Sequence, residues 1–302
     1  METTPRAATA ATARTTATGR TARTARTTAS ASTARTTSSA RSPRISYTVE
    51  GAGPAVILVH GWCCDRSFLD PQREYLRHGH TVVALDLRGH GESEAAAGDA
   101  YAIGDFADDV AAVVAETGLE SPVVIGHSMG ALVALECAAR GLAGGVVLLD
   151  SAPLLDERGK SYFRRSAEVV AEDHDGAWRR AFVDRLFLPT DRVRRDDVRE
   201  RMPRTPVIVA AAAMRGMGEY DAAEALRHTR APVLAVAAAK GEDLRPVREV
   251  CPGLVTGQTV GAGHFHQLEV PDQVNAMIAR FLDIHGLGGI GAPERGTGIR
   301  PS

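Results

Sequence analysis

The sequence is poor in cysteine and has no long apolar run, and each shortage excludes a class of protein. Four of the 302 residues are cysteines, namely Cys63, Cys64, Cys137 and Cys251. They form no C-x-x-C pair and no other spacing typical of zinc ligands, so neither a disulfide framework nor a metal site is predicted. No stretch approaches the roughly 18 to 20 consecutive apolar residues that a membrane-spanning helix requires. We therefore expect a soluble, cytoplasmic protein with reduced thiols and no membrane partner.

An excess of basic side chains is missing as well. The 35 lysines and arginines are balanced by 37 aspartates and glutamates, which gives a formal net charge of -2. Proteins that bind nucleic acid usually carry a clear positive excess, because they neutralise phosphate groups. Nucleic acid is therefore not expected as a partner, and a small-molecule substrate is. The oligomeric state cannot be inferred from these numbers.

Both ends of the chain lack the residues from which a hydrophobic core is built. Residues 1–44 consist almost wholly of Ala, Thr, Arg and Ser, with eight arginines and no Leu, Ile, Val or Phe. Such a segment cannot bury enough apolar surface to offset the entropy of ordering, so we predict a disordered tail. It also has no apolar h-region of the kind a secretory signal needs. Residues 286–302 are rich in Gly and Pro and are predicted to be a second, flexible tail.

Between the tails, short apolar runs alternate with helical patterns. This alternation is typical of a mostly parallel sheet with crossover helices. Six segments are candidate strands, and most of them are nearly continuous in Val, Ile, Leu and Ala, as expected for strands that are covered on both faces. They are Ala55–His60, Thr81–Leu85, Pro122–Gly126, Gly145–Asp150, Pro232–Ala237 and Val255–Val260. We predict the α/β class, with a doubly wound sheet.

A long interval between the fourth and fifth of these runs breaks the alternation. It contains two charged, helix-favouring stretches, 166–186 and 191–201, and the apolar stretch 206–217. We predict a helical cap over residues 156–229, inserted at the carboxyl edge of the sheet, where open α/β folds bind ligands. The core would then comprise residues 45–155 and 230–285. Five apolar residues of the cap either line a pocket or only pack its helices: Phe182, Leu186, Phe187, Met214 and Met217.

Residues 126–130 read Gly-His-Ser-Met-Gly, which has the G-x-S-x-G spacing of a nucleophile elbow. The pentapeptide follows a predicted strand and opens a helical pattern at Ala131–Ala139, which is the context that the motif requires. Small residues permit the tight turn, and the helix N-terminus favours negative charge developing beside the serine. We predict Ser128 as the nucleophile and the backbone N–H of Met129 as one donor of an oxyanion hole.

A second backbone donor is expected after the first apolar run, where the sequence reads His60-Gly61-Trp62. The glycine allows a sharp turn that directs the Trp62 N–H toward the same oxygen as the Met129 N–H. His60 itself is interpreted as a residue that satisfies local backbone groups. These positions therefore complete a predicted oxyanion hole at Trp62 and Met129.

A histidine for general base catalysis follows the last predicted strand, in the segment Gly261-Ala262-Gly263-His264-Phe265. A glycine-rich loop lets the imidazole approach the nucleophile, and this histidine comes after the serine in chain order, as the nucleophile-elbow motif requires. His264 is the predicted base. His266 is a rival, although the flanking glycines favour His264.

Four segments together resemble the signature blocks of the α/β-hydrolase family, in the family's order, over about residues 45 to 285. They are His60-Gly61, Asp86–Ser93, Gly126–Gly130 and Gly263-His264-Phe265. The resemblance implies the α/β-hydrolase fold, a serine nucleophile within a catalytic triad, and neither an organic cofactor nor a metal. It does not imply a particular substrate.

The triad acid departs from the family's commonest pattern. Most members carry it after the strand predicted at 232–237, and the usual position falls near Gly241, so Asp243 requires a longer turn. A minority of the family carries the acid at the end of the preceding strand, where this sequence has Asp150. A buried carboxylate without a partner is costly, so a partner such as His264 is expected there. Asp150 is preferred, and Asp243 and Glu242 remain alternatives.

These residues predict an esterase-like enzyme that hydrolyses a small or medium carboxylic ester, a lactone or a related acyl compound. The same residue set also serves family members that hydrolyse C–C bonds, act as metal-free haloperoxidases or act as cofactor-free dioxygenases. A non-catalytic small-molecule receptor on the same fold is the alternative from another class.

Overall fold

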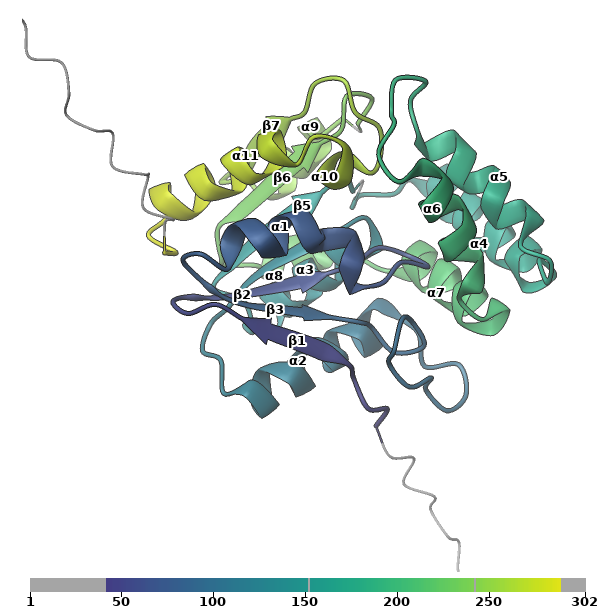
Figure 1. Ribbon diagram of the computed structural model, residues 1–302, viewed down its shortest axis with the longest axis horizontal. Coiled ribbons are helices and arrows are strands. Elements are labelled where there is room, and N and C mark those ends of the chain that lie inside the picture. Colours follow the sequence, from purple (N-terminus) through teal and green to yellow (C-terminus); the bar gives the residue numbers. More distant parts are fainter. Residues whose placement is uncertain (1–41, 152, 242, 289–302) are drawn as a thin grey trace, which may run out of the picture. The chain divides into compact units, whose positions relative to one another are not determined.

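The computed structural model describes residues 42–151, 153–241 and 243–288. Within these ranges seven strands form one sheet in the order β1-β3-β2-β4-β5-β6-β7 (Figure 1). β1 is antiparallel to β3, and the other neighbouring pairs are parallel. The predicted mostly parallel α/β sheet is confirmed. The strands are β1 (Tyr47–Glu50), β2 (Ala55–Val59), β3 (Thr81–Leu85), β4 (Val123–His127), β5 (Gly145–Leu149), β6 (Val233–Ala237) and β7 (Val255–Gln258).

The strand missed by the sequence analysis is β1. It has four residues, and Val49 is exposed at this edge of the sheet. Its sequence, Tyr-Thr-Val-Glu, lacks the apolar run by which most of the other strands were recognised. Most of the predicted tails, residues 1–41 and 289–302, lie outside the described residues.

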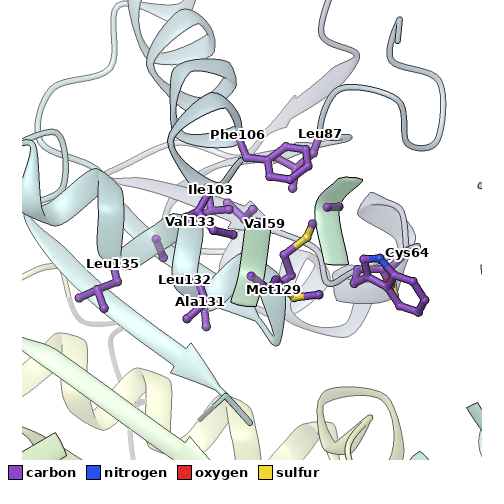
Figure 2. Close-up of a cluster of buried hydrophobic side chains, with 14 of the residues drawn as sticks. Val59, Cys64, Leu87, Ile103, Phe106, Met129, Ala131, Leu132, Val133 and Leu135 are labelled. Atoms are coloured by element: carbon purple, nitrogen blue, oxygen red, sulfur yellow. The ribbon is translucent and has the colours of Figure 1, made fainter. Parts of the chain in front are cut away.

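The helices cover both faces of the sheet (Figure 1). Val56 and Leu58 of β2 pack into one hydrophobic cluster with α1 and α11, while Ile57 and Val59 of the same strand point into the other cluster, with α2 and α3. Figure 2 shows part of this second cluster around Val59. The alternation along the strand thus explains why the run is apolar throughout. The covering helices are α1 (Asp70–Leu76), α2 (Ile103–Thr117), α3 (Met129–Ala139), α8 (Ala222–His228), α9 (Arg245–Val250) and α11 (Pro271–Ile284).

Four α-helices between β5 and β6, here called the inserted helices, gather beyond one edge of the sheet (Figure 1). The stretch 166–186 is divided between two of them, since α4 ends at Ala171 and α5 begins at Ala177, directly after Gly176 in a left-handed conformation with φ of 72°. The next helix, α8, lies within the predicted cap interval 156–229 but packs against α3. The inserted helices are α4 (Glu157–Ala171), α5 (Ala177–Leu186), α6 (Arg195–Arg201) and α7 (Val207–Glu219). Short helices lie at η1 (Arg66–Leu69), η2 (Met202–Arg204) and α10 (His266–Glu269).

None of the helices within the described ranges combines the length and the hydropathy needed to cross a membrane.

Candidate active site

Ser128 lies on the turn between β4 and α3 in a backbone conformation that residues with side chains rarely adopt. Its φ is 54° and its ψ is -116°. Such a conformation costs on the order of 1–3 kcal/mol and is found mainly where function requires it. The turn is held by hydrogen bonds from Ser128 N–H to the Leu149 carbonyl, 2.9 Å, and from Ala131 N–H to the Ser128 carbonyl, 3.0 Å. The strain therefore marks Ser128 as a candidate functional residue.

Glycine is required on both sides of this turn. A Cβ atom at Gly126 would lie 2.0 Å from the Gly130 carbonyl oxygen, and one at Gly130 would lie 2.3 Å from the Val59 carbonyl oxygen. A Cβ atom at Gly61 would lie 3.3 Å from the Ser128 Cβ atom. The close approach of β2, β4 and α3 explains the two glycines of the motif, and it brings the Gly61 turn against the serine.

His264 and Asp150 form a hydrogen-bonded pair at the ends of β7 and β5. His264 Nδ1 lies 2.7 Å from Asp150 Oδ2, and the Ala238 N–H donates to Asp150 Oδ1 at 2.8 Å. Burial raises the pKa of Asp150, but the hydrogen bond and charge of His264 and the Ala238 N–H outweigh it and lower the pKa to about 2. An ionised Asp150 fixes the proton on His264 Nδ1, which leaves Nε2 free to accept a proton.

The alternative acids and the alternative base are arranged differently. Asp243 accepts hydrogen bonds from the Arg245 guanidinium, 2.6 to 2.9 Å away, and lines a separate surface depression. Glu242 lies outside the described residues. His266 is buried, with Nδ1 3.1 Å from Thr259 Oγ1, and burial lowers its pKa to about 4. The geometry therefore favours Asp150 and His264 over these rivals.

Ser128, His264 and Asp150 line one cavity of about 750 Å³. The Ser128 hydroxyl forms no hydrogen bond with His264 among the described residues; such bonds often tighten only when substrate binds. Much of the remaining wall is apolar and comes from the inserted helices. Of the five cap residues singled out by sequence, Phe182, Leu186, Met214 and Met217 line the cavity. The fifth, Phe187, stacks on Phe265 with ring centroids 5.1 Å apart.

The backbone of Trp62 and Met129 lies at the same cavity. Neither N–H group has a hydrogen-bond partner within the part of the chain that the structure describes. The Trp62 indole Nε1–H donates to the Ala210 carbonyl at 2.8 Å, which ties this turn to α7. His60 donates from Nδ1 to the Gly61 carbonyl and accepts at Nε2 from the Leu87 N–H. Two free donors beside Ser128 are what an oxyanion hole requires.

Sequence reasoning missed the contribution of His127, the variable residue before the serine. Its Nε2–H donates to the His264 carbonyl at 2.9 Å, and the two rings lie 4.7 Å apart between centroids. Burial and the neighbouring His264 lower the pKa of His127 well below its usual value, so the ring is neutral. The elbow therefore positions the backbone of the predicted base as well as the serine.

Asp191, between α5 and α6, was also missed. Its buried carboxylate accepts hydrogen bonds from the Gly263 N–H at 3.1 Å and from the Leu188 N–H at 2.7 Å. Next to it, the His264 N–H donates to the Leu186 carbonyl at 2.9 Å. The loop that carries His264 is thus bound to the inserted helices. No local motif could reveal this contact, because its partners are 72 residues apart.

Among the residues that the structure describes, no three histidine, cysteine or carboxylate side chains are grouped so that they could hold a metal ion.

Comparison with known proteins agrees with this architecture. The model of a family described as the alpha/beta hydrolase family matches residues 56–277. A 2-(acetamidomethylene)succinate hydrolase of Mesorhizobium japonicum is 26% identical over 259 residues, which cover 78% of this chain and 90% of that protein. A non-heme haloperoxidase of Rhodococcus erythropolis is 38% identical over 115 residues, covering 37% of this chain and 42% of the relative. A solved esterase from Thermogutta terrifontis superposes with a TM-score of 0.72 and 27% identity, covering 80% and 94% of the two chains.

Proposed function

Since the chain belongs to the alpha/beta hydrolase family, we propose that it is a cofactor-independent serine hydrolase of small or medium carboxylic esters, lactones or related acyl compounds. Ser128 is the nucleophile, His264 the general base and Asp150 the acid that orients the base. The observation that carries the proposal is the 2.7 Å contact between His264 and Asp150 in the cavity that the strained Ser128 also lines.

The reaction follows from this arrangement. His264 Nε2 takes the proton of Ser128 as its Oγ atom attacks the acyl carbon, and Asp150 stabilises the resulting imidazolium. The N–H groups of Trp62 and Met129 hold the oxyanion, and each such donor contributes roughly 3 kcal/mol in comparable enzymes. The imidazolium then protonates the leaving alcohol. In the second half, His264 deprotonates a water molecule that attacks the acyl-enzyme, releases the acid and restores Ser128.

The inserted helices act as a cap that selects the acyl group. Their apolar side chains form much of a cavity of about 750 Å³, which falls within the roughly 300–1,000 Å³ usual for small-molecule sites. Met214 and Met217 are almost fully buried and also pack the helices. The same residues therefore line the cavity and pack the inserted helices against one another. Substitutions at these positions should alter both the substrate range and the stability of the protein.

Hydrolysis of p-nitrophenyl esters from short to long acyl chains tests the proposal. Wild-type protein should turn over part of this series, and Ser128→Ala should lower kcat by at least about a thousandfold, because the nucleophile is lost. Equal turnover by the variant would contradict the assignment of Ser128. A different outcome would favour the receptor alternative: wild-type protein would bind a small-molecule ligand tightly, but it would neither hydrolyse esters nor react with a fluorophosphonate.

A second candidate activity is perhydrolysis followed by halide oxidation. It is favoured by the similarity to a protein named as a non-heme haloperoxidase, and the same serine and histidine would serve it. Bromination of monochlorodimedone in acetate, hydrogen peroxide and bromide measures this activity, because the peracid oxidises bromide to the brominating species. A rate that exceeds ester hydrolysis and depends on Ser128 would favour it over the hydrolase.

A further inference from the structure

Two cationic side chains at the cavity have no part in the proposed triad. Arg158, in the first turn of α4, and Lys240, in the turn after β6, both line the cavity with Ser128 and His264. We propose that Arg158 and Lys240 together bind an anionic group, so that the substrate is an acyl compound bearing a free carboxylate. This inference rests on the proposed hydrolase function and names its substrate class.

Neither cation has a charged partner among the described residues. Arg158 and Lys240 form no ion pair or side-chain hydrogen bond with any residue that the structure describes. Nearby cations, by contrast, form ion pairs. Lys160 Nζ, also on α4, lies 3.0 Å from Glu157 Oε1, and the Arg245 guanidinium pairs with the Asp243 carboxylate. A cation without an internal partner, on the wall of a cavity, is available to an anionic ligand.

The acidic side chains of the cavity have other partners. Asp150 is hydrogen-bonded to His264, and Asp156 accepts the Gly159 N–H at 2.7 Å as the cap of α4. Neither carboxylate forms an ion pair with Arg158 or Lys240. The two cations therefore face the ligand space rather than balancing internal carboxylates.

Their position suits a substrate with one apolar and one charged part. Arg158 and Lys240 belong to segments that follow the neighbouring parallel strands β5 and β6, which end at the edge where Ser128 lies. Both side chains are solvent-exposed, so they lie at the entrance, while Leu132, Phe182 and Met214 supply apolar wall. A carboxylate at the entrance would stay hydrated and paired, which avoids the cost of burying it alone.

Matched ester pairs test the proposal. The substrates are mono-p-nitrophenyl esters of dicarboxylic acids from glutarate to suberate, each compared with its methyl p-nitrophenyl diester, which is neutral. Wild-type protein should prefer the anionic ester of the best-fitting length by about tenfold in kcat/KM, as expected for two partly exposed charge pairs. Arg158→Gln and Lys240→Gln should each reduce this preference by about threefold, because kcat/KM falls more for the anionic ester than for its neutral partner. Lys160→Gln, which removes a charge from the same helix away from the cavity wall, should leave the preference unchanged.

The outcomes separate this proposal from the hydrolase itself. Ser128-dependent hydrolysis without an anionic preference, or a preference that Lys160→Gln reduces as much as the other two variants, overturns the anion site and leaves the hydrolase standing. If no ester is turned over, calorimetric titration of Ser128→Ala with adipate and with dimethyl adipate tests whether the anion site exists. Binding of adipate alone, lost on Arg158→Gln or Lys240→Gln, supports the site, and equal or absent binding of both ligands overturns it.

Discussion

Asp150 and Asp243 differ in their exposure and in the side chain that each contacts. Asp150 has 14% of its side chain exposed and touches His264, whereas Asp243 has 49% exposed and touches Arg245. Chain order could not decide between them, because both lie between the serine and the histidine. The geometry favours Asp150, because the pairing of β5 with β6 sets it beside the Ala238 N–H and its carboxylate contacts His264.

Replacement of each aspartate separates their roles. Asp150→Asn should lower kcat by about 10³- to 10⁴-fold, because the amide no longer holds the proton on His264 Nδ1. Asn tolerates the left-handed backbone of residue 150, whose φ is 43°, so the fold should persist. Asp243→Asn should change kcat little. Ester kinetics with circular dichroism as a folding control measures both, and the reverse order of effects would assign the acid to Asp243.

Asp150 should also make stability depend on pH. Its pKa is lowered from 3.8 to about 2 in the folded chain, so its contribution is complete above about pH 4 and is lost as pH falls through about 2. The difference in unfolding free energy between wild type and Asp150→Asn should therefore shrink with acid, by up to about 2 kcal/mol. Urea unfolding between about pH 5 and pH 3 should reveal the start of this decline. A difference that stays constant over this range would show that the pair does not stabilise the ionised carboxylate.

Among the elements, β4 and α3 approach so closely at the elbow that no side chain fits between them and β2. Gly130→Ala would place a Cβ atom 2.3 Å from the Val59 carbonyl oxygen, and backbone cannot yield as a flexible side chain can. We expect this variant to lose at least about 1–3 kcal/mol of unfolding free energy. Gly253→Ala meets no atom within 4 Å and is the matched control. Equal stability of the two variants in urea would contradict the packing described for the elbow.

The contact between the inserted helices and the His264 loop predicts a kinetic effect far from the serine. Asp191→Asn removes the negative charge and replaces one of the two oxygens that face the Gly263 N–H, at 3.1 and 3.3 Å, with an amide donor, so the His264 loop should shift. We expect kcat to fall by about 10- to 100-fold with little change in KM, since small displacements of a reacting group are costly.

A matched control exists for this prediction in Glu269. Its carboxylate accepts hydrogen bonds from the N–H groups of Arg192 and Val193, in the same link between α5 and α6, but not from Gly263. Glu269→Gln should therefore leave kcat nearly unchanged. If both variants lower kcat and the thermal midpoint together, Asp191 only stabilises the link and does not position His264.

At the scale of the whole molecule, the candidate site gathers residues that follow β2, β4, β5 and β7 at one edge of the sheet. This convergence could be predicted from sequence, because parallel strands end on the same side and bring their loops together. Ser128 and His264 were predicted in this way, and the structure places both at one cavity. The six predicted strands fell within two residues of their observed bounds. The polar partners His127 and Asp191 could not be found, since each contacts the His264 loop across more than seventy residues of sequence.

Covalent labelling of the nucleophile tests the central claim most directly. Wild-type protein is incubated with a fluorophosphonate, digested, and analysed by mass spectrometry to locate the adduct. We predict a single adduct on Ser128, absent in Ser128→Ala and formed at least about a hundredfold more slowly in His264→Ala, which lacks the base. An unlabelled wild-type protein, or an adduct that persists on another residue in Ser128→Ala, would contradict the assignment of Ser128 as an activated nucleophile.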